Sequence, residues 1–90
     1  MRVSIKLDSQ TASELHGDAA ATARSGSLVE TARRHGAALQ PMHPGTSDPE
    51  LRTYFFAETG DAAKAETLAT ALRKHESVEG AYVKPPDALP

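Results

Sequence analysis

The chain has 90 residues, enough for one domain and too few for two. Its formal net charge is −2, so electrostatics gives no reason to expect nucleic acid or an anionic membrane as a partner. It has no cysteine, which excludes disulfides, zinc–thiolate sites and thiol catalysis.

The first predicted element is a strand over residues 2–8. Val3, Ile5 and Leu7 alternate with polar residues, and such alternation is typical of a half-buried strand. Because this strand follows Met1 directly, we expect that a signal peptide is absent or already removed. Residues 9–24 are small and polar. We predict a loop there, with at most a helical turn or an early start of the next helix.

A helix is predicted over residues 27–35. Ser27 and Glu30 match a capping box, in which each side chain satisfies the backbone amide of the other residue. The basic run 33–35 complements the negative end of a helix, and Gly36 supplies the stop.

Two strands are predicted next. Residues 37–43 form a plausible short strand, which Pro41 restricts to a sheet edge because proline has no backbone donor. A dense turn cluster follows over 44–49. Residues 51–59 carry the strongest strand signal, with three aromatic residues in succession.

The last part of the chain predicts a second helix, a final strand and a tail. Asp61 is a good N-cap, and the residues after it form an apolar helical face. Residues 80–84 read as a strand. The proline-rich segment 85–90 is expected to be an extended tail.

The element order is therefore β-α-β-β-α-β. It predicts an α+β, ferredoxin-like fold: a four-stranded antiparallel sheet in the order 4-1-3-2, with two helices on one face. We expect one domain over residues 1–84 and an extended tail over 85–90.

Catalytic and metal-binding patterns are not apparent in the sequence. The four histidines have no ligand-like spacing, and there is neither a Gly-x-Ser-x-Gly elbow nor a glycine-rich phosphate loop. We therefore predict a protein that is no enzyme and has no metal or cofactor.

The sheet face without helices is more informative. If Phe55 faces the core, its neighbours Tyr54 and Phe56 lie on the uncovered face, and in the last strand Tyr82 does the same. Exposed aromatic residues that share one face favour a protein interface. The alternatives are that residues 9–24 cover this face or that the face assignment is inverted.

The segment Val78-Glu79-Gly80-Ala81-Tyr82-Val83, after a helix that ends Leu72-Arg73-Lys74-His75, resembles the end of subtilisin-family propeptides and of the inhibitors built like them. The resemblance covers about residues 1–7 and 27–90. It implies a domain that acts as an intramolecular chaperone, as an inhibitor, or as both, for a subtilisin-like serine protease.

The same resemblance implies where the chain would touch that protease. The open sheet face, with Tyr54, Phe56 and Tyr82, would dock on the protease surface. The tail would enter the substrate cleft, with residues 87–90 in the non-primed subsites. The residues that the resemblance assigns to the substrate cleft are Lys84, at the end of the last strand, and the tail residues Pro85, Pro86, Asp87, Ala88, Leu89 and Pro90.

This sequence also departs from the family pattern. The family usually has acidic residues just after the Tyr-Val pair, whereas this chain has Lys84, Pro85 and Pro86 there, and only Asp87 is acidic. Pro90 suits a terminal subsite poorly, so either Leu89 takes the pocket nearest the scissile bond or the natural chain continues.

A second hypothesis is a ferredoxin-like ligand-binding or regulatory module that dimerises through its sheet. The protease hypothesis instead predicts a monomer when free. It predicts secretion for an excised prodomain and a cytoplasmic location for a stand-alone inhibitor. Neither hypothesis involves nucleic acid or a membrane.

Overall fold

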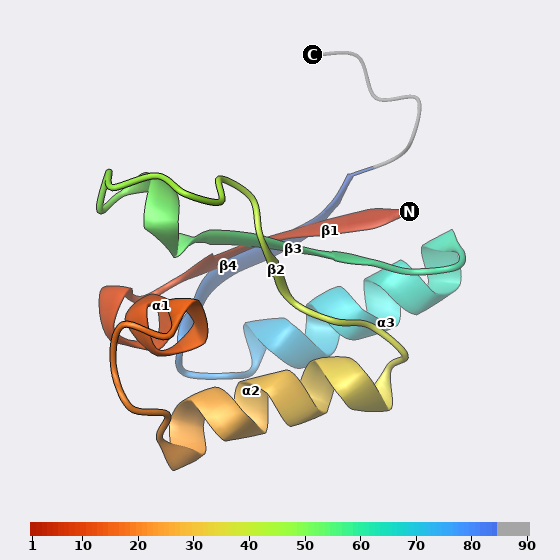
Figure 1. The fold of residues 1–90 in the computed structure, drawn as a ribbon. Helices are drawn as coiled ribbons and strands as arrows, with labels where there is room; N and C mark the ends of the chain where they lie inside the picture. Colours follow the sequence, from red (N-terminus) through yellow and green to blue (C-terminus); the bar gives the residue numbers. More distant parts are fainter. Residues whose placement is uncertain (85–90) are drawn as a thin grey trace.

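The computed structural model describes residues 1–84 (Figure 1). Three α-helices, one 3-10 helix and four strands make up this part of the chain. In chain order they are β1 (Arg2–Leu7), α1 (Ser9–His16), α2 (Ala23–Arg34), β2 (Gln40–Pro41), the 3-10 helix η1 (Leu51–Thr53), β3 (Tyr54–Glu58), α3 (Ala62–Arg73) and β4 (Val78–Lys84).

The four strands form one antiparallel sheet in the order β2-β3-β1-β4. Read from the other edge this is 4-1-3-2, so the predicted ferredoxin-like α+β arrangement is confirmed. The short strand with Pro41 lies at the edge, where a residue without a backbone donor breaks no second ladder.

Helices α2 and α3 lie side by side against one face of the sheet, and α1 lies near one end (Figure 1). The core between the layers is built from alternate strand residues and one stripe of each helix. Its members are Val3, Ile5, Leu7, Ala12, Leu28, Ala32, Phe55, Ala57, Ala65, Leu68, Ala69, Leu72 and Ala81. The alternation in β1 therefore predicted correctly that Val3, Ile5 and Leu7 face the core.

The prediction of a loop over residues 9–24 is wrong for its first half, which forms helix α1. The Asp8 side chain accepts a hydrogen bond from the Thr11 amide at 2.7 Å and caps the start. Gly17 ends the helix at φ 85°, a conformation that costs glycine little. The Thr11 hydroxyl donates to Oγ of Ser77, which lies 66 residues away in the sequence. No local sequence pattern indicates such a contact.

Helix α2 begins four residues earlier than predicted, and Ser27 lies inside it rather than at its cap. The N-cap is Thr22, whose amide donates to Ser25 Oγ at 3.2 Å. The predicted stop is confirmed, since Gly36 has φ 73°.

The remaining boundaries also shift. The strand expected over 37–43 pairs only at Gln40–Pro41, and the one expected over 51–59 starts at Tyr54, after η1. Strand β4 begins at Val78, two residues early. Asp61 is the N-cap of α3 as predicted, accepting from the Lys64 amide at 2.8 Å.

Candidate protein-docking surface

One row of residues crosses the sheet on the face that carries no helix. In register, Gln40 pairs with Phe56, Phe56 with Ser4, and Ser4 with Tyr82. Tyr54 lies two residues before Phe56 in β3, opposite Lys6. Their sequence neighbours Phe55 and Ala81 are core residues, so alternation places all three predicted aromatic residues on the open face.

The three aromatic side chains differ in how accessible they are. Tyr82 is 59% exposed, whereas Tyr54 and Phe56 are half-buried. The Arg2 guanidinium lies 4.1 Å from the centre of the Phe56 ring, and the same group pairs with Glu58 at 2.9 Å. This cation–π contact shields Phe56 from one side. Tyr82 is therefore the most available anchor of the row.

Polar groups occupy the end of the face near Tyr54. Lys6 Nζ lies 3.0 Å from Glu50 and 3.7 Å from Glu79, and 5.7 Å from the centre of the Tyr54 ring. The hydrogen bond to Glu50 raises the pKa of Lys6 above its ordinary value. Tyr54 also donates its hydroxyl to Glu50 at 3.4 Å. Since Glu50 comes from the segment between β2 and η1, this segment restrains Tyr54.

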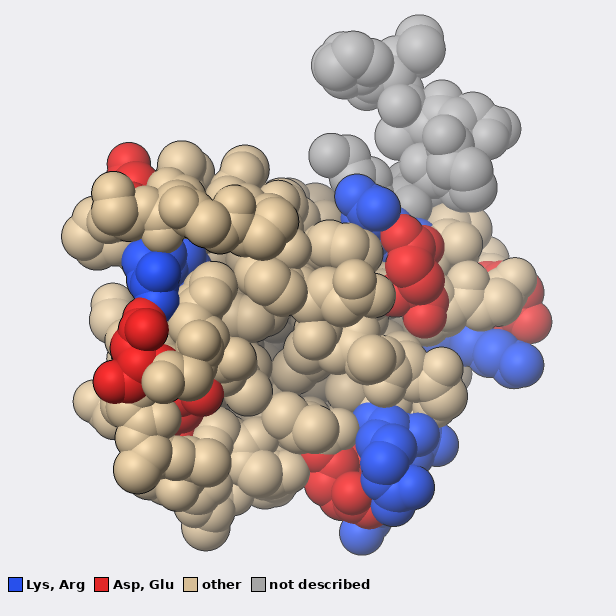
Figure 2. Space-filling view, viewed as in Figure 1, with Lys and Arg blue, Asp and Glu red and all other residues tan. Residues whose placement is uncertain are grey.

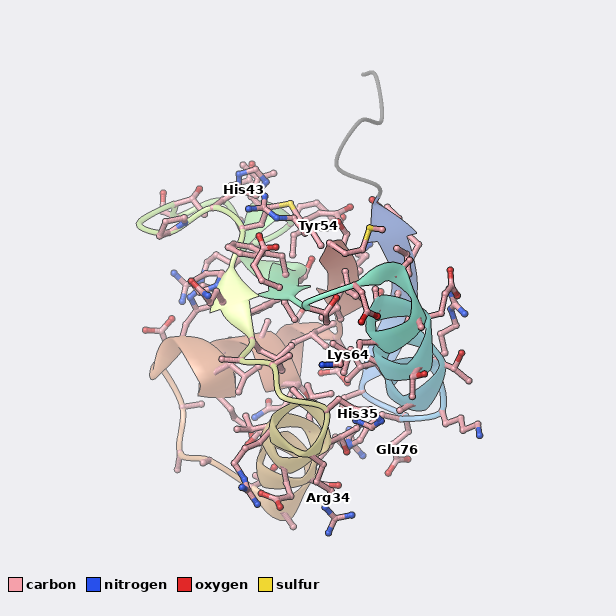
Figure 3. The ribbon with its side chains drawn as sticks, turned by 90° about the vertical axis from the view of Figure 1, so that its right-hand side faces the viewer. Arg34, His35, His43, Tyr54, Lys64 and Glu76 are labelled. Atoms are coloured by element: carbon pink, nitrogen blue, oxygen red, sulfur yellow. The ribbon has the colours of Figure 1, made fainter. Side chains whose placement is uncertain are left out.

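A histidine from the same segment also contacts Tyr54. The rings of His43 and Tyr54 make an edge-to-face contact with centres 6.5 Å apart, and both labels lie together in Figure 3. Alternation in β1 predicts Lys6 on this face, but nothing in the sequence signals that Glu50 or His43 reaches it.

Helix α1 does not cover the open face. Its buried residues Thr11, Ala12 and Glu14 face the body of the domain, and the His16 ring packs at a tilt against the ring of Phe55, a core residue, with the two centres 5.1 Å apart. The alternative in which residues 9–24 fold over the aromatic side chains is therefore not what the structure has.

Ser4 occupies the middle of the row and is almost fully buried, with 2% of its surface exposed. Its hydroxyl has no hydrogen-bond partner within the described part of the chain. Ser4 is the shortest side chain on this face of β1, between Phe56 and Tyr82 on the neighbouring strands.

The predicted tail begins where the description ends. Lys84 is the last residue of β4, opposite Arg2. The predicted site residues Pro85, Pro86, Asp87, Ala88, Leu89 and Pro90 lie outside the described residues.

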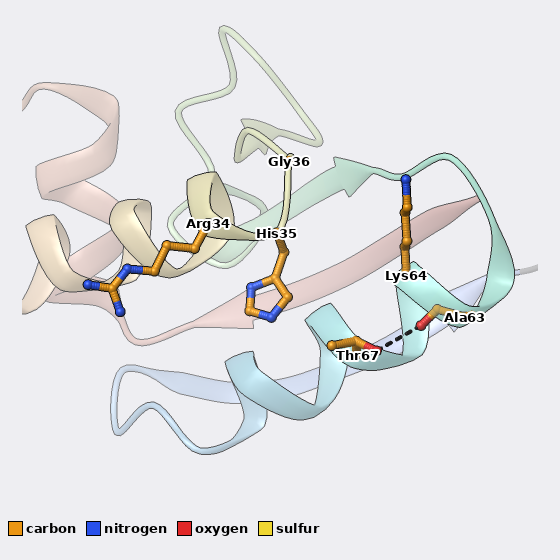
Figure 4. A pocket seen from close by; sticks show the side chains of 6 residues that line it. All are labelled: Arg34, His35, Gly36, Ala63, Lys64 and Thr67. Carbon is orange, nitrogen blue, oxygen red and sulfur yellow. Dashed lines mark hydrogen bonds between the residues drawn. The ribbon is translucent and has the colours of Figure 1, made fainter.

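A second feature lies between the end of α2 and the start of α3. Arg34, His35 and Lys64 line a surface hollow of about 460 Å³ (Figure 4). The Arg34 and Lys64 side chains point away from His35 in that view, so the three basic groups do not converge on one point. Arg34 instead lies 3.5 Å from Glu30, within its own helix.

Charges of both signs are interspersed on the face seen in Figure 2. Among residues 1–84, no cluster of three or more His, Asp or Glu side chains has a geometry that could hold a metal ion. No helix in the same part of the chain is long and apolar enough to cross a membrane.

Comparison with known proteins adds no relative. No family model matches the sequence, and neither the curated proteins nor the solved structures provide a match.

Proposed function

We propose that this chain is a protein-binding domain that inhibits a subtilisin-like serine protease, in the manner of a prodomain or of a stand-alone inhibitor. The open sheet face docks on the protease, and the tail after Lys84 enters the substrate cleft. A prodomain of this kind also assists the folding of its own protease.

The observation that carries the proposal is the exposure of Tyr82 on a helix-free sheet face, two residues before the end of β4. Large aromatic side chains are the usual anchors of protein interfaces. Because only Val83 and Lys84 separate Tyr82 from the tail, a partner held by this face keeps the tail at a high effective concentration near its surface.

An extended tail can also bind a protease by strand addition, through backbone hydrogen bonds at the substrate-binding edge. Pro85 and Pro86 restrict the free chain, so less conformational entropy is lost when the tail binds. Docking and threading thus support each other, although neither alone accounts for tight inhibition.

The test is inhibition of a panel of subtilisin-family proteases by the full chain and by a chain that lacks residues 87–90. We expect inhibition by the full chain and its loss on truncation, with unchanged circular dichroism. A full chain that inhibits no member of the panel contradicts the proposal.

The competing proposal is a ligand-binding or regulatory module that dimerises through its sheet. Such a dimer would use the same exposed Tyr82. Sedimentation of the full and truncated chains distinguishes the two. A symmetric dimer at micromolar concentration that persists without the tail favours the regulatory module, whereas a monomer favours the inhibitor.

A further inference from the structure

An apolar hollow of about 440 Å³ lies between helices α1 and α2 and strand β2, on the side of the molecule seen in Figure 2. Among the described residues, the exposed Arg33 is the one charged residue that lines it. Its larger apolar lining residues are Leu15, Val29, Leu39, Pro41 and Phe55. Mostly apolar hollows of this size with a few polar groups are typical binding sites, and the groups beside this one indicate what fits it.

Strand β2 leaves backbone groups unpaired next to the hollow. The Met42 amide donates to the Tyr54 carbonyl at 3.0 Å, and Gln40 keeps the same register, so the backbone groups of both residues point to β3. Because successive residues of an antiparallel strand direct these groups to opposite sides, those of Leu39 and Pro41 point to the free edge. Proline has no N–H, so this edge offers the Leu39 amide and the carbonyls of Leu39 and Pro41. None of the three hydrogen-bonds to another residue of the described chain.

The free edge and the hollow lie on the same side of β2. The Leu39 and Pro41 side chains line the hollow, and so does Phe55, which pairs with Pro41 in register. Side chains directly opposite each other on antiparallel strands share one face of the sheet. An antiparallel strand added at this edge would therefore direct its residues opposite Leu39 and Pro41 toward the hollow.

The charges at the hollow favour an acidic partner. Arg33 donates Nε and Nη2 to the Glu30 carboxylate at 2.9 and 2.5 Å, and Arg34 Nε lies 3.5 Å from the same carboxylate. Two guanidinium groups thus share one carboxylate, which leaves one positive charge in excess. Nη1 of Arg33 has no hydrogen bond within residues 1–84. An acidic residue beside Arg33 fits this charge, although pairing at so exposed a site changes affinity only a few-fold.

We propose that β2 binds an extended peptide segment of a partner as a fifth, antiparallel strand, with one large apolar side chain of the peptide in the hollow and an acidic residue beside Arg33. In such strand addition the backbone hydrogen bonds supply affinity and the pocket for alternate side chains supplies specificity. Strands β2 and β4 are opposite edges of the sheet, so this site is separate from Tyr82 and does not rest on the proposed function.

The test titrates the full chain with a capped, threonine-rich peptide that carries one leucine and, two residues before it, one aspartate. Backbone amide NMR signals report binding, and we expect saturable shifts centred on Leu39 and protection of its amide from hydrogen exchange. Replacing the leucine of the peptide with serine should weaken binding about 10- to 100-fold. N-methylation of the leucine removes a donor to β2 and should weaken binding about 5-fold or more. N-methylation of the next threonine, whose N–H points away from β2, is the matched control and should have little effect.

Variants of the chain locate the site. Val29→Glu is compared with Thr70→Glu, because both residues are β-branched, exposed and within a helix of 12 residues, but only Val29 lines the hollow. We expect Val29→Glu to weaken binding about 10-fold or more, since it brings a charge against an apolar side chain, and Thr70→Glu to bind normally. Arg33→Gln should weaken binding of the aspartate peptide about 2- to 5-fold and leave an asparagine version unaffected.

Four results overturn the proposal. They are the absence of saturable shifts, equal binding of the peptide N-methylated at leucine, normal binding by folded Val29→Glu, and binding of hexanoate as tight as that of the peptide. The last result makes the hollow a site for small apolar carboxylates. The peptide comparisons use the wild-type chain and remain decisive if a variant fails to fold.

Discussion

Replacing Tyr82 with alanine should separate binding from folding. A tyrosine presents about 200 Å² of surface, so 59% exposure leaves about 120 Å² in water. At about 25 cal/mol per Å², complete burial of that area stabilises a complex by about 3 kcal/mol. Because only part of such a gain appears in affinity, we expect inhibition of the protease to weaken about 10- to 100-fold.

The assay is the inhibition constant of Tyr82→Ala against a protease that the wild-type chain inhibits, with thermal unfolding as the check on folding. Val29→Ala is the matched control, because Val29 is also large, apolar and 44% exposed, yet lies on α2 and away from the sheet's open face. We expect the control to inhibit normally. Equal inhibition by Tyr82→Ala and the wild type refutes the assignment of the docking face.

Two further predictions concern stability. Hydrogen bonds from Thr22 and Gln10 lower the pKa of Glu14 from its usual 4.5 to about 2. The folded carboxylate therefore binds its proton more weakly than the unfolded one, and its stabilising effect is complete above pH 4.5 and is lost as the pH falls toward 2. Glu14→Gln should lower the unfolding midpoint at pH 7 and reduce its change between these pH values. In denaturant unfolding, Gly26→Ala inside α2 should stabilise by about 1 kcal/mol, whereas Gly36→Ala at φ 73° should destabilise by about 1–2 kcal/mol.

Clear results contradict each of these two. A pH dependence of the midpoint that is unchanged in Glu14→Gln means that another group dominates acid unfolding. Apart from the adjoining chain, no atom lies within 4 Å of a Cβ added at either glycine, so the pair tests backbone conformation alone. Effects of the same sign at both positions contradict the backbone argument.

The elements whose signals are local were predicted well. Alternation identified β1 and its buried face, and Asp61 and the apolar face after it identified α3. Helix α1 was not predicted, because only Ala12 and Leu15 contribute apolar periodicity over residues 9–16. Its capping residues, Asp8 and Gly17, are present in the sequence, but without an apolar face between them they do not by themselves indicate a helix.

The candidate docking surface, too, could be predicted from the sequence only in part. The spacing of Tyr54, Phe56 and Tyr82 sufficed to place them on one face, because side chains alternate along a strand. Their different accessibility could not be predicted, since the Arg2 side chain covers Phe56 and the segment with Glu50 restrains Tyr54. Such cover depends on which strands pair and in which register.

By itself, the sequence determined the order of the four strands and of helices α2 and α3, the sheet topology and the helix-free aromatic face, since periodicity and turn residues act over a few neighbouring positions. Only the tertiary structure decided that Ser4, which pairs in register with Phe56 and Tyr82, is buried, and that Glu14 accepts a hydrogen bond from the amide of Thr22, the N-cap of α2. Strand pairing brings Ser4 beside residues more than fifty positions away, and the burial that follows is a property of the assembled sheet.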